Sequence, residues 1–321
     1  MRWIALMVMA TSFWAGAFIA GKIGLRTATP MTLTFTRFLL AVACLFLYAR
    51  FKGISLRVRR RDLGPLALTG LVGMVGYHLL FFQALRHTTA IKTAMIGATN
   101  PLMAAVLAAL ALGERLDRRR IALMVTALAG VLLTISNWHP ALLLRQGPSL
   151  GDLFMGGAVV CWSVYSVLVR RLVRRFDPIV TTFYSFLTCA AALAPFQAAV
   201  LWRQGPAIDA PGWLAIVYMG LFPTFIGYLV QQQAIKHLGV SKAALFINLV
   251  PVEVMILAVA ILGETFLPLN LVSAAMIIGS VLAFSLLPAP SPAPAGTGPR
   301  PDAGRSRPPV PPPHPGPGEP G

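Results

Sequence analysis

Arg37 and Glu253 stand deep inside long apolar stretches of the sequence, where a charged side chain is unusual. By helical rise, Arg37 lies roughly 10 Å beyond Pro30 and Glu253 roughly 16 Å before Glu264, so the two depths nearly match. A charge is costly to hold in an apolar environment, and its presence therefore points to function. A guanidinium binds carboxylates and phosphates, while a carboxylate can pair with it or carry a proton. We predict that both line a central binding site; a static pair that only fixes helix packing is the alternative.

Aromatic residues and one histidine on other apolar stretches are candidates to complete such a site. Trp14 and Trp162 occupy matching positions in two related segments, where they could stack on a ligand or pack as ordinary core aromatics. His78 could line a cavity and titrate, or it could be a neutral histidine hydrogen-bonded between helices. Tyr165 and Gln231–Gln233 are weaker candidates of the same kind.

The sequence lacks the motifs of an enzyme or a metal site. It contains no HExxH, GxSxG or Walker loop, and its histidines are scattered. The three cysteines, Cys44, Cys161 and Cys189, stand singly inside apolar stretches, as buried packing residues do. We therefore predict no catalytic residue, no bound metal and no cofactor.

Membrane-spanning helices are the elements that must position these residues. The chain is 57% apolar and only 12% charged, whereas a soluble protein is about 25% charged. A helix needs about 20 apolar residues to cross the hydrocarbon core, where it satisfies its own backbone. The sequence predicts ten such spans, near residues 3–21, 30–49, 63–85, 90–112, 121–137, 151–170, 178–202, 212–235, 240–262 and 268–287.

The distribution of basic residues predicts how these spans are oriented. With both termini in the cytoplasm, 20 Lys and Arg residues fall on the cytoplasmic side and 6 on the outer side. This bias is the one that proteins of the inner membrane show. It accounts for the net charge of +17, so a nucleic-acid partner is not expected. Residues 288–321 hold 14 of the 26 prolines and are predicted to form a disordered cytoplasmic tail.

The sequence repeats itself in two halves, residues 3–137 and 150–287. Residues 83–114 align with residues 233–264 at a constant offset of 150, and earlier segments align at an offset of 148. Each half contains an odd number of predicted spans, so the second half must enter the membrane from the opposite face. Such inverted repeats are typical of secondary transporters, whose binding site lies near the membrane midplane between the halves.

Paired motifs in the fourth span of each half carry a family resemblance. NPLMAAVLAALALGE (100–114) and LVPVEVMILAVAILGE (249–264) each place a proline early and end in Leu-Gly-Glu. Together with FWAGAFIAGK in the first span, they resemble the EamA family of the drug/metabolite transporter superfamily. The resemblance covers about residues 3–287. It implies an all-α integral membrane protein with ten transmembrane helices in two inverted five-helix repeats.

The resemblance also implies a function. It points to a secondary transporter that exports a small metabolite such as an amino acid, or a drug, by alternating access, with a proton as the candidate counter-ion. Pro101 and Pro251 each remove a backbone donor, so they could act as symmetric hinges or as static kinks. A nucleotide-sugar-type exchanger of the same fold and a membrane-embedded enzyme are the alternatives. The expected partners are a small-molecule substrate and the lipid bilayer, and a homodimer is left open.

Overall fold

The computed structural model describes residues 2–112, 117–141, 145, 147–173, 175–204, 208–238 and 246–287. These residues form helices joined by short turns, and no strand occurs among them. The all-helical fold predicted from the sequence is therefore confirmed. Eight of the described helical stretches are long and apolar enough to cross a membrane: Arg2–Gly24, Pro30–Phe51, Arg60–His87, Ala90–Leu107, Leu150–Leu172, Pro178–Arg203, Ala210–Ala234 and Leu269–Leu286.

The helices follow the same order in each half of the chain. The first half contains α1 (Arg2–Gly24), α2 (Pro30–Phe51), α3 (Arg60–Thr69), the π-helical turn η1 (Gly70–Gly76), α4 (Tyr77–His87), α5 (Ala90–Gly97), α6 (Asn100–Leu112) and α7 (Arg118–Ile135). The second half contains α9 (Leu150–Leu172), α10 (Pro178–Gln204), α11 (Ala210–Met219), the π-helical turn η2 (Gly220–Ile226), α12 (Gly227–Leu238), α14 (Val250–Leu257), the π-helical turn η3 (Ala258–Leu262) and α15 (Leu269–Leu286).

The predicted number of ten spans is matched in part. The predicted ninth span is a shorter apolar helix, Val250–Leu262, made of α14 and η3. The predicted fifth span is α7, which begins with three arginines and is not among the eight long apolar stretches. These two spans stay predictions. The predicted proline-rich tail, residues 288–321, lies outside the described residues.

The wide turns η1 and η2 sit at the same place in the two halves, at the offset of 150 that relates the sequences. Each begins with a glycine because another helix backbone comes very close there. A Cβ on Gly70 would lie 2.6 Å from the carbonyl oxygen of Ser185, and a Cβ on Gly220 would lie 3.2 Å from that of Arg37. Arg37 and Ser185 are themselves repeat partners at the offset of 148. Therefore α2 crosses η2 as α10 crosses η1.

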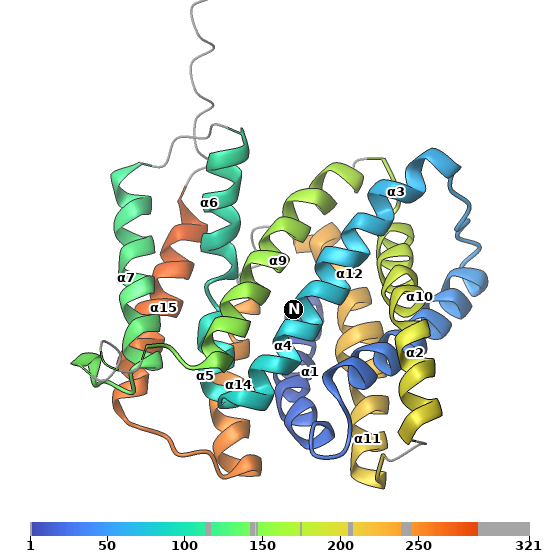
Figure 1. The fold of residues 1–321 in the computed structure, drawn as a ribbon. Helices are drawn as coiled ribbons and strands as arrows, with labels where there is room; N and C mark the ends of the chain where they lie inside the picture. The colour runs from blue at the N-terminus through green and yellow to red at the C-terminus, as the bar shows by residue number, and fades with distance from the viewer. Residues whose placement is uncertain are drawn as a thin grey trace, which may run out of the picture.

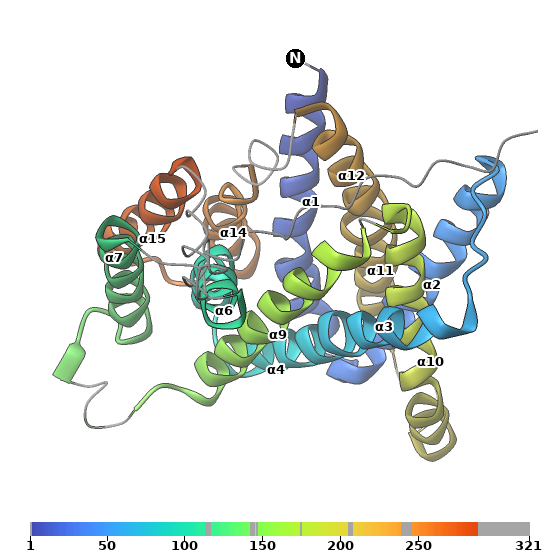
Figure 2. The ribbon, with the colours of Figure 1, turned by 90° about the horizontal axis from the view of Figure 1, so that it is seen from above.

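The helices are grouped along the molecule, as Figures 1 and 2 show. The pair α7 and α15 packs at one end, and the pair α2 and α10 packs at the opposite end. Between them, α1 contacts α5, α11, α12 and α14. One buried apolar cluster surrounds Phe18 and Phe82, and a second surrounds Phe38 and Phe186. In lipid such association rests on close packing and interhelical hydrogen bonds, and the second cluster is the one that holds α2 beside η2.

Candidate functional site

Arg37 lies on α2, about two turns from the helix start at Pro30, and only 4% of the residue is exposed. Its Nε donates a hydrogen bond to Thr224 Oγ1 on η2. Thr224 lies in the π-helical turn η2, close to the carbonyl oxygen of Met219 five residues before it. The Thr224 hydroxyl donates to that oxygen at 2.6 Å, which leaves its own oxygen to accept from Arg37.

The guanidinium of Arg37 has no acidic partner in the described part of the chain. The only ion pair at 4.0 Å or less found there joins Arg175 and Asp62. A buried guanidinium without a counter-charge is costly to maintain. Its remaining N–H groups are arranged to bind a carboxylate or a phosphate.

A series of aromatic rings in contact with one another extends from this guanidinium, beginning at Phe38, and we call it the aromatic cluster. Its members are Phe38, Tyr77, His78, Trp162, Tyr165, Phe186 and Tyr228. The ring of Phe38 lies 5.5 Å from the guanidinium carbon of Arg37. The ring of Trp162 lies 4.9 Å from that of Tyr77 and 5.1 Å from that of Tyr165. The predicted residues Arg37, Trp162 and Tyr165 are thus brought into one neighbourhood.

His78 belongs to this cluster through its ring contacts. Its ring centroid is 4.7 Å from that of Phe38 and 4.8 Å from that of Tyr77. Only 3% of the residue is exposed, and its Nδ1 donates to the carbonyl oxygen of Met74 at 3.1 Å. That oxygen belongs to η1, one turn earlier in the same helix, so the hydrogen bond holds the ring within its own helix.

Trp14 reaches the same neighbourhood from α1. Its Nε1 donates to the carbonyl oxygen of Pro223 at 2.9 Å, directly before Thr224. The indole fits there because residue 227 is a glycine, where a Cβ would lie 2.9 Å from the same nitrogen. Its repeat partner Trp162 packs among tyrosines instead. The two tryptophans therefore have matching positions in sequence and different contacts in space.

Glu253 lies apart from this group, on the side of α1 that faces α14. Its Oε1 accepts hydrogen bonds from the hydroxyls of Ser12 at 3.0 Å and Thr11 at 3.3 Å. Its Oε2 is buried and has no hydrogen-bond partner among the described residues. Arg37 and Glu253 form no ion pair in this structure. The static pair that the sequence also allowed is therefore not formed here, and the two charges occupy separate sites beside α1.

Pro101 and Pro251, the predicted hinges, occupy equivalent positions at breaks in the helices. Pro101 is the second residue of α6, and a two-residue turn separates it from α5. Pro251 is the second residue of α14 and follows a turn at Asn248 and Leu249. A proline suits the first turn of a helix because the N–H that it lacks would have no partner there. Their action as hinges stays a prediction.

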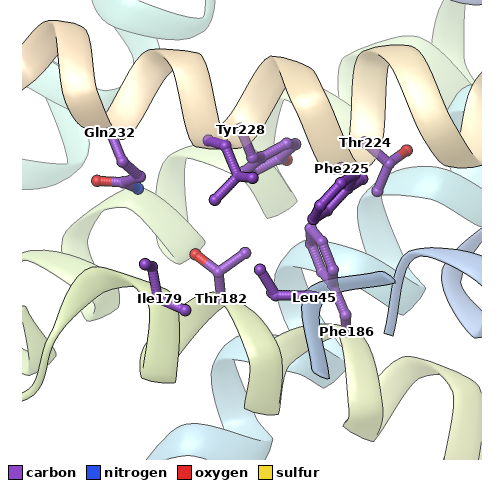
Figure 3. Close-up of a pocket in the computed structure, with 9 residues that line it drawn as sticks. Leu45, Ile179, Thr182, Phe186, Thr224, Phe225, Tyr228 and Gln232 are labelled. Carbon is purple, nitrogen blue, oxygen red and sulfur yellow. The ribbon is translucent and has the colours of Figure 1, made fainter. Parts of the chain in front are cut away.

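A narrow pocket with a volume of about 10 Å³, room for about one water molecule, reaches Thr224 from between α2, α10 and α12 (Figure 3). Most of its lining is apolar, with hydroxyl and amide groups added by a few residues. It is lined by Leu45, Ile179, Thr182, Phe186, Thr224, Phe225, Tyr228, Leu229 and Gln232. Tyr228 and Phe186 belong to the aromatic cluster, and Thr224 is the residue that binds Arg37. The pocket therefore adjoins the guanidinium.

Most of the sequence matches one family of proteins. The sequence model of the EamA-like transporter family matches residues 1–136 and 149–286, which is most of the chain. The chain belongs to the EamA-like transporter family. It is therefore a multi-pass membrane transporter and not an enzyme. A transporter of this family has a small-molecule substrate and lies in membrane lipid.

Several relatives of this EamA-like transporter are named as transporters or exporters. The uncharacterized transporter YyaM of Bacillus subtilis is 32% identical over 288 residues, which cover 88% of this chain and 93% of YyaM. A probable terminal-alkyne amino-acid exporter of Streptantibioticus cattleyicolor is 29% identical over 87% of this chain and 91% of its own length. The aromatic amino acid exporter YddG of Ancylobacter novellus is 27% identical over 65% of this chain and 71% of its own length.

A solved crystal structure has the same overall fold as this EamA-like transporter. A crystal structure superposes with a TM-score of 0.62 at 23% identity, and the match covers 89% of this chain and 97% of the other. At that identity the likeness concerns the fold alone.

Sequence reasoning missed several residues of the site in this EamA-like transporter. Thr224 and Tyr77 are uncharged residues inside apolar spans, where composition does not single them out. Tyr228 could have been found, because it is the partner of His78 at the repeat offset of 150. Gln232 was included only as a weaker candidate within a glutamine run, and it lines the pocket.

Proposed function

We propose that this transporter is a secondary transporter of the inner membrane that exports a small metabolite bearing a carboxylate, such as an amino acid, by alternating access. One observation carries the proposal: the guanidinium of Arg37 is buried, lacks an acidic partner among the described residues and lies against the aromatic cluster at Phe38. A substrate carboxylate would accept its N–H groups, and an apolar or aromatic substrate side chain would pack on the rings. The names of two relatives, both amino-acid exporters, support this choice.

Alternating access follows, in this proposal, from the relation between the halves. The crossing of α2 over η2 repeats the crossing of α10 over η1, and we propose that the halves are inverted in the membrane with both termini in the cytoplasm. Pro101 and Pro251 would be symmetric points at which the fourth span of each half bends. The substrate would be exposed to one side and then the other as the halves change their packing.

Glu253 is the proposed carrier of the coupling proton. An ionised carboxylate among apolar helices is costly unless its oxygens are paired, and Oε2 is buried without a partner in the described chain. Protonation removes the charge, while the hydroxyls of Ser12 and Thr11 can turn to suit either form of Oε1. Because Glu253 contacts α1, which also carries Trp14 beside Thr224, one helix contacts both sites.

The substrate class is tested by removing the carboxylate from the substrate rather than from the protein. Purified protein in liposomes is loaded with unlabelled L-amino acids, and uptake of labelled tryptophan, leucine and alanine by counterflow is measured. Tryptophanamide and tryptamine are supplied as competitors that lack the carboxylate. We expect competition by the amino acid and at least about tenfold weaker competition by the amide, since a charge-assisted hydrogen bond is lost. Equal competition by all three would contradict the role of Arg37, and transport only of cationic drugs would favour the alternative substrate class.

The coupling role is tested with Glu253→Gln, which keeps the shape and removes the titration. We expect substrate exchange to persist and the stimulation by an imposed pH gradient to vanish. Ser12→Ala is the matched control, since it removes one hydrogen bond to the same oxygen and leaves the carboxylate. Unchanged gradient-driven transport in Glu253→Gln would contradict the role of Glu253 as the proton carrier, while the role of Arg37 in substrate binding would be unaffected.

A further inference from the structure

A second pocket opens where the loop between α2 and α3 meets the turn between α9 and α10. It has a volume of about 260 Å³ and is lined by Arg57, Val58, Arg59, Arg61, Asp62, Arg175 and Phe176. The segments that line it connect four helices: α2 ends at Phe51 and α3 begins at Arg60, while α9 ends at Leu172 and α10 begins at Pro178. The pocket therefore lies at the ends of the predicted spans.

The loop that carries the arginines is held in place by the helices beneath it. The hydroxyl of Tyr184 on α10 donates to the carbonyl oxygen of Leu56 at 2.9 Å, and the N–H of Ile54 donates to that of Ala49 at 2.9 Å. Ile54 and Leu56 pack against the second apolar cluster. Burial alternates along this extended segment, so that Arg57 and Arg59 are exposed. The arginines are thus presented on an anchored segment.

The charges in this pocket do not balance. Arg175 donates to Asp62 at 3.1 Å, and the Asp62 side chain is only 8% exposed. That carboxylate is the one acidic group of the lining. Arg57, Arg59 and Arg61 have no acidic partner within 4.0 Å in the described residues. Three guanidinium groups therefore share a pocket with nothing to neutralise them, which is an arrangement suited to an anion with several oxygens.

The other half of the protein supplies an anion of its own at the equivalent position. Arg59 is the N-cap of α3 and makes no side-chain capping bond. Its repeat partner at the offset of 150 is Asp209, the N-cap of α11, whose carboxylate accepts from the N–H of Gly212 at 2.9 Å and from the hydroxyl of Thr27 at 2.7 Å. The start of a helix favours a negative charge. The first half has a cation at the cap position where the second half has a carboxylate, and the one carboxylate in the first turn of α3, Asp62, is paired with Arg175.

Exposed apolar side chains of the same helix ends show what kind of molecule would carry the anion. Phe51 is 87% exposed at the end of α2, Leu63 is 41% exposed next to Asp62, and Val173 is 37% exposed just before the turn to α10. A ligand with a phosphate and long apolar chains would contact both surfaces. Basic pockets at the ends of membrane helices bind lipid headgroups in this way.

We propose that this basic pocket binds the phosphate group of an anionic glycerophospholipid. Arg57, Arg59 and Arg61 would hold the phosphate oxygens beside the start of α3, with the acyl chains along Phe51, Leu63 and Val173. The bound phosphate would lie at the cap position of α3 that Asp209 occupies in α11 of the second half. This role is separate from the transport site, and its test does not depend on the substrate.

The experiment compares lipids bound to the purified protein by native mass spectrometry in nanodiscs of equal parts phosphatidylglycerol and phosphatidylcholine. The triple variant Arg57→Gln, Arg59→Gln, Arg61→Gln removes the pocket charges. The control triple Arg50→Gln, Arg118→Gln, Arg119→Gln removes equal charge at exposed positions that the sequence places on the same membrane face. We expect retained phosphatidylglycerol in the wild type and the control triple, and about a tenfold lower ratio to phosphatidylcholine in the pocket triple. An equal fall of this lipid ratio in the two triple variants would mean that any basic residue near the membrane attracts phosphatidylglycerol, and it would contradict a specific lipid site in this pocket.

Two further measurements distinguish a bound lipid from a free phosphate ion and from a change in folding. Arg59→Asp copies the residue of the second half, so we expect it to fold, to keep its melting temperature and to lose the preference for phosphatidylglycerol. Retained preference in a folded Arg59→Asp protein would contradict the proposal. Inorganic phosphate at millimolar concentration is added to protein in phosphatidylcholine alone; stabilisation equal to that by phosphatidylglycerol would mean a free-anion site and would overturn the lipid assignment.

Discussion

The crossing of α2 over η2 and the crossing of α10 over η1 have the same backbone and different side chains. In both, a glycine at the start of the π-helical turn lies against the carbonyl oxygen of a residue on the crossing helix. That residue is Arg37 in one crossing and Ser185 in the other. Arg37 donates to Thr224, whereas the hydroxyl of Ser185 bonds the hydroxyl of Thr69 at 2.9 Å. One fold position is therefore compatible with a charge and with a small neutral group.

This difference separates the requirements of the fold from those of the site. Ser185 also donates to the carbonyl oxygen of Thr181 at 2.9 Å, so its polar atom is satisfied within its own helix. Arg37 cannot be satisfied in that way, because its charge extends across the helix interface. Since the crossing forms without a charge at Ser185, the fold does not require one at Arg37. A residue retained at such cost is best explained by the ligand it binds.

Replacing Arg37 with the residue of the other crossing should have the largest effect. Arg37→Ser should lower substrate transport by about 100-fold, because two charge-assisted hydrogen bonds to a carboxylate are worth roughly 3 kcal/mol. The melting temperature should be unchanged or higher, since a buried unpaired charge is removed. Counterflow in liposomes and thermal unfolding in detergent check the two parts. Ser185→Ala, the matched change at the other crossing, should leave transport within about twofold of wild type; equal losses in both variants would mean that the crossings have the same role.

Adding a methyl group to each glycine should distinguish the crossings by stability. In Gly70→Ala the new Cβ meets the Ser185 carbonyl oxygen and the Thr188 Cβ, both at 2.6 Å, and neither can easily move away. In Gly220→Ala the nearest atom is the end of the Leu40 side chain at 2.8 Å, which can adjust. We expect Gly70→Ala to cost about 1–3 kcal/mol by overpacking and Gly220→Ala clearly less. Thermal unfolding measures both, and the reverse order would refute the geometry of the crossings.

The sequence predicts much of this architecture because apolar length, basic-residue bias and internal repetition are properties of the chain itself. Arg37 and Glu253 were found because a charge inside an apolar span is visible in composition. The π-helical turns were not found, since no residue pattern distinguishes Gly70–Gly76 from an ordinary apolar helix. The aromatic cluster was found in part, because a span contains many aromatic residues and only packing shows which of them meet.

Glu264 shows why contacts of backbone groups escape a reading of the sequence. No basic residue follows it closely, so the sequence offers no partner for its carboxylate. In the structure its two oxygens accept from the N–H groups of Ala90 at 2.7 Å and Ile91 at 3.1 Å, at the start of α5. The unpaired backbone N–H groups at a helix start can bind an anion, as a Lys or Arg side chain can. The partner was a helix end 174 residues away, which no search for Lys or Arg could find.

Removing the hydroxyl that binds Arg37 should have an intermediate effect. Thr224→Val keeps the shape of the side chain but leaves the Nε of Arg37 without its acceptor and removes the hydroxyl hydrogen bond to the Met219 carbonyl oxygen. We expect a loss of stability of about 1–3 kcal/mol and weaker substrate binding of about tenfold, since the guanidinium is no longer held in place. Thr69→Val at the other crossing should affect stability alone. Substrate affinity from counterflow, measured for both variants, decides whether Thr224 positions Arg37.

The smallest effect is expected at the start of α11, outside the spans, where the second half has Asp209 and the first half has Arg59. The hydroxyl of Thr27 and the N–H of Gly212 hold the pKa of the Asp209 carboxyl below its ordinary value of 3.8. A lowered folded-state pKa contributes stability above the unfolded-state pKa, and this contribution is lost as the pH falls through the folded-state value. Asp209→Asn should therefore melt slightly below wild type at pH 7 and together with it in strong acid. Arg59→Gln, the change at the equivalent first-half position, should show no such convergence, because no carboxylate occupies that cap position. A difference between Asp209→Asn and wild type that persists unchanged in acid would mean that shape, and not charge, caps α11.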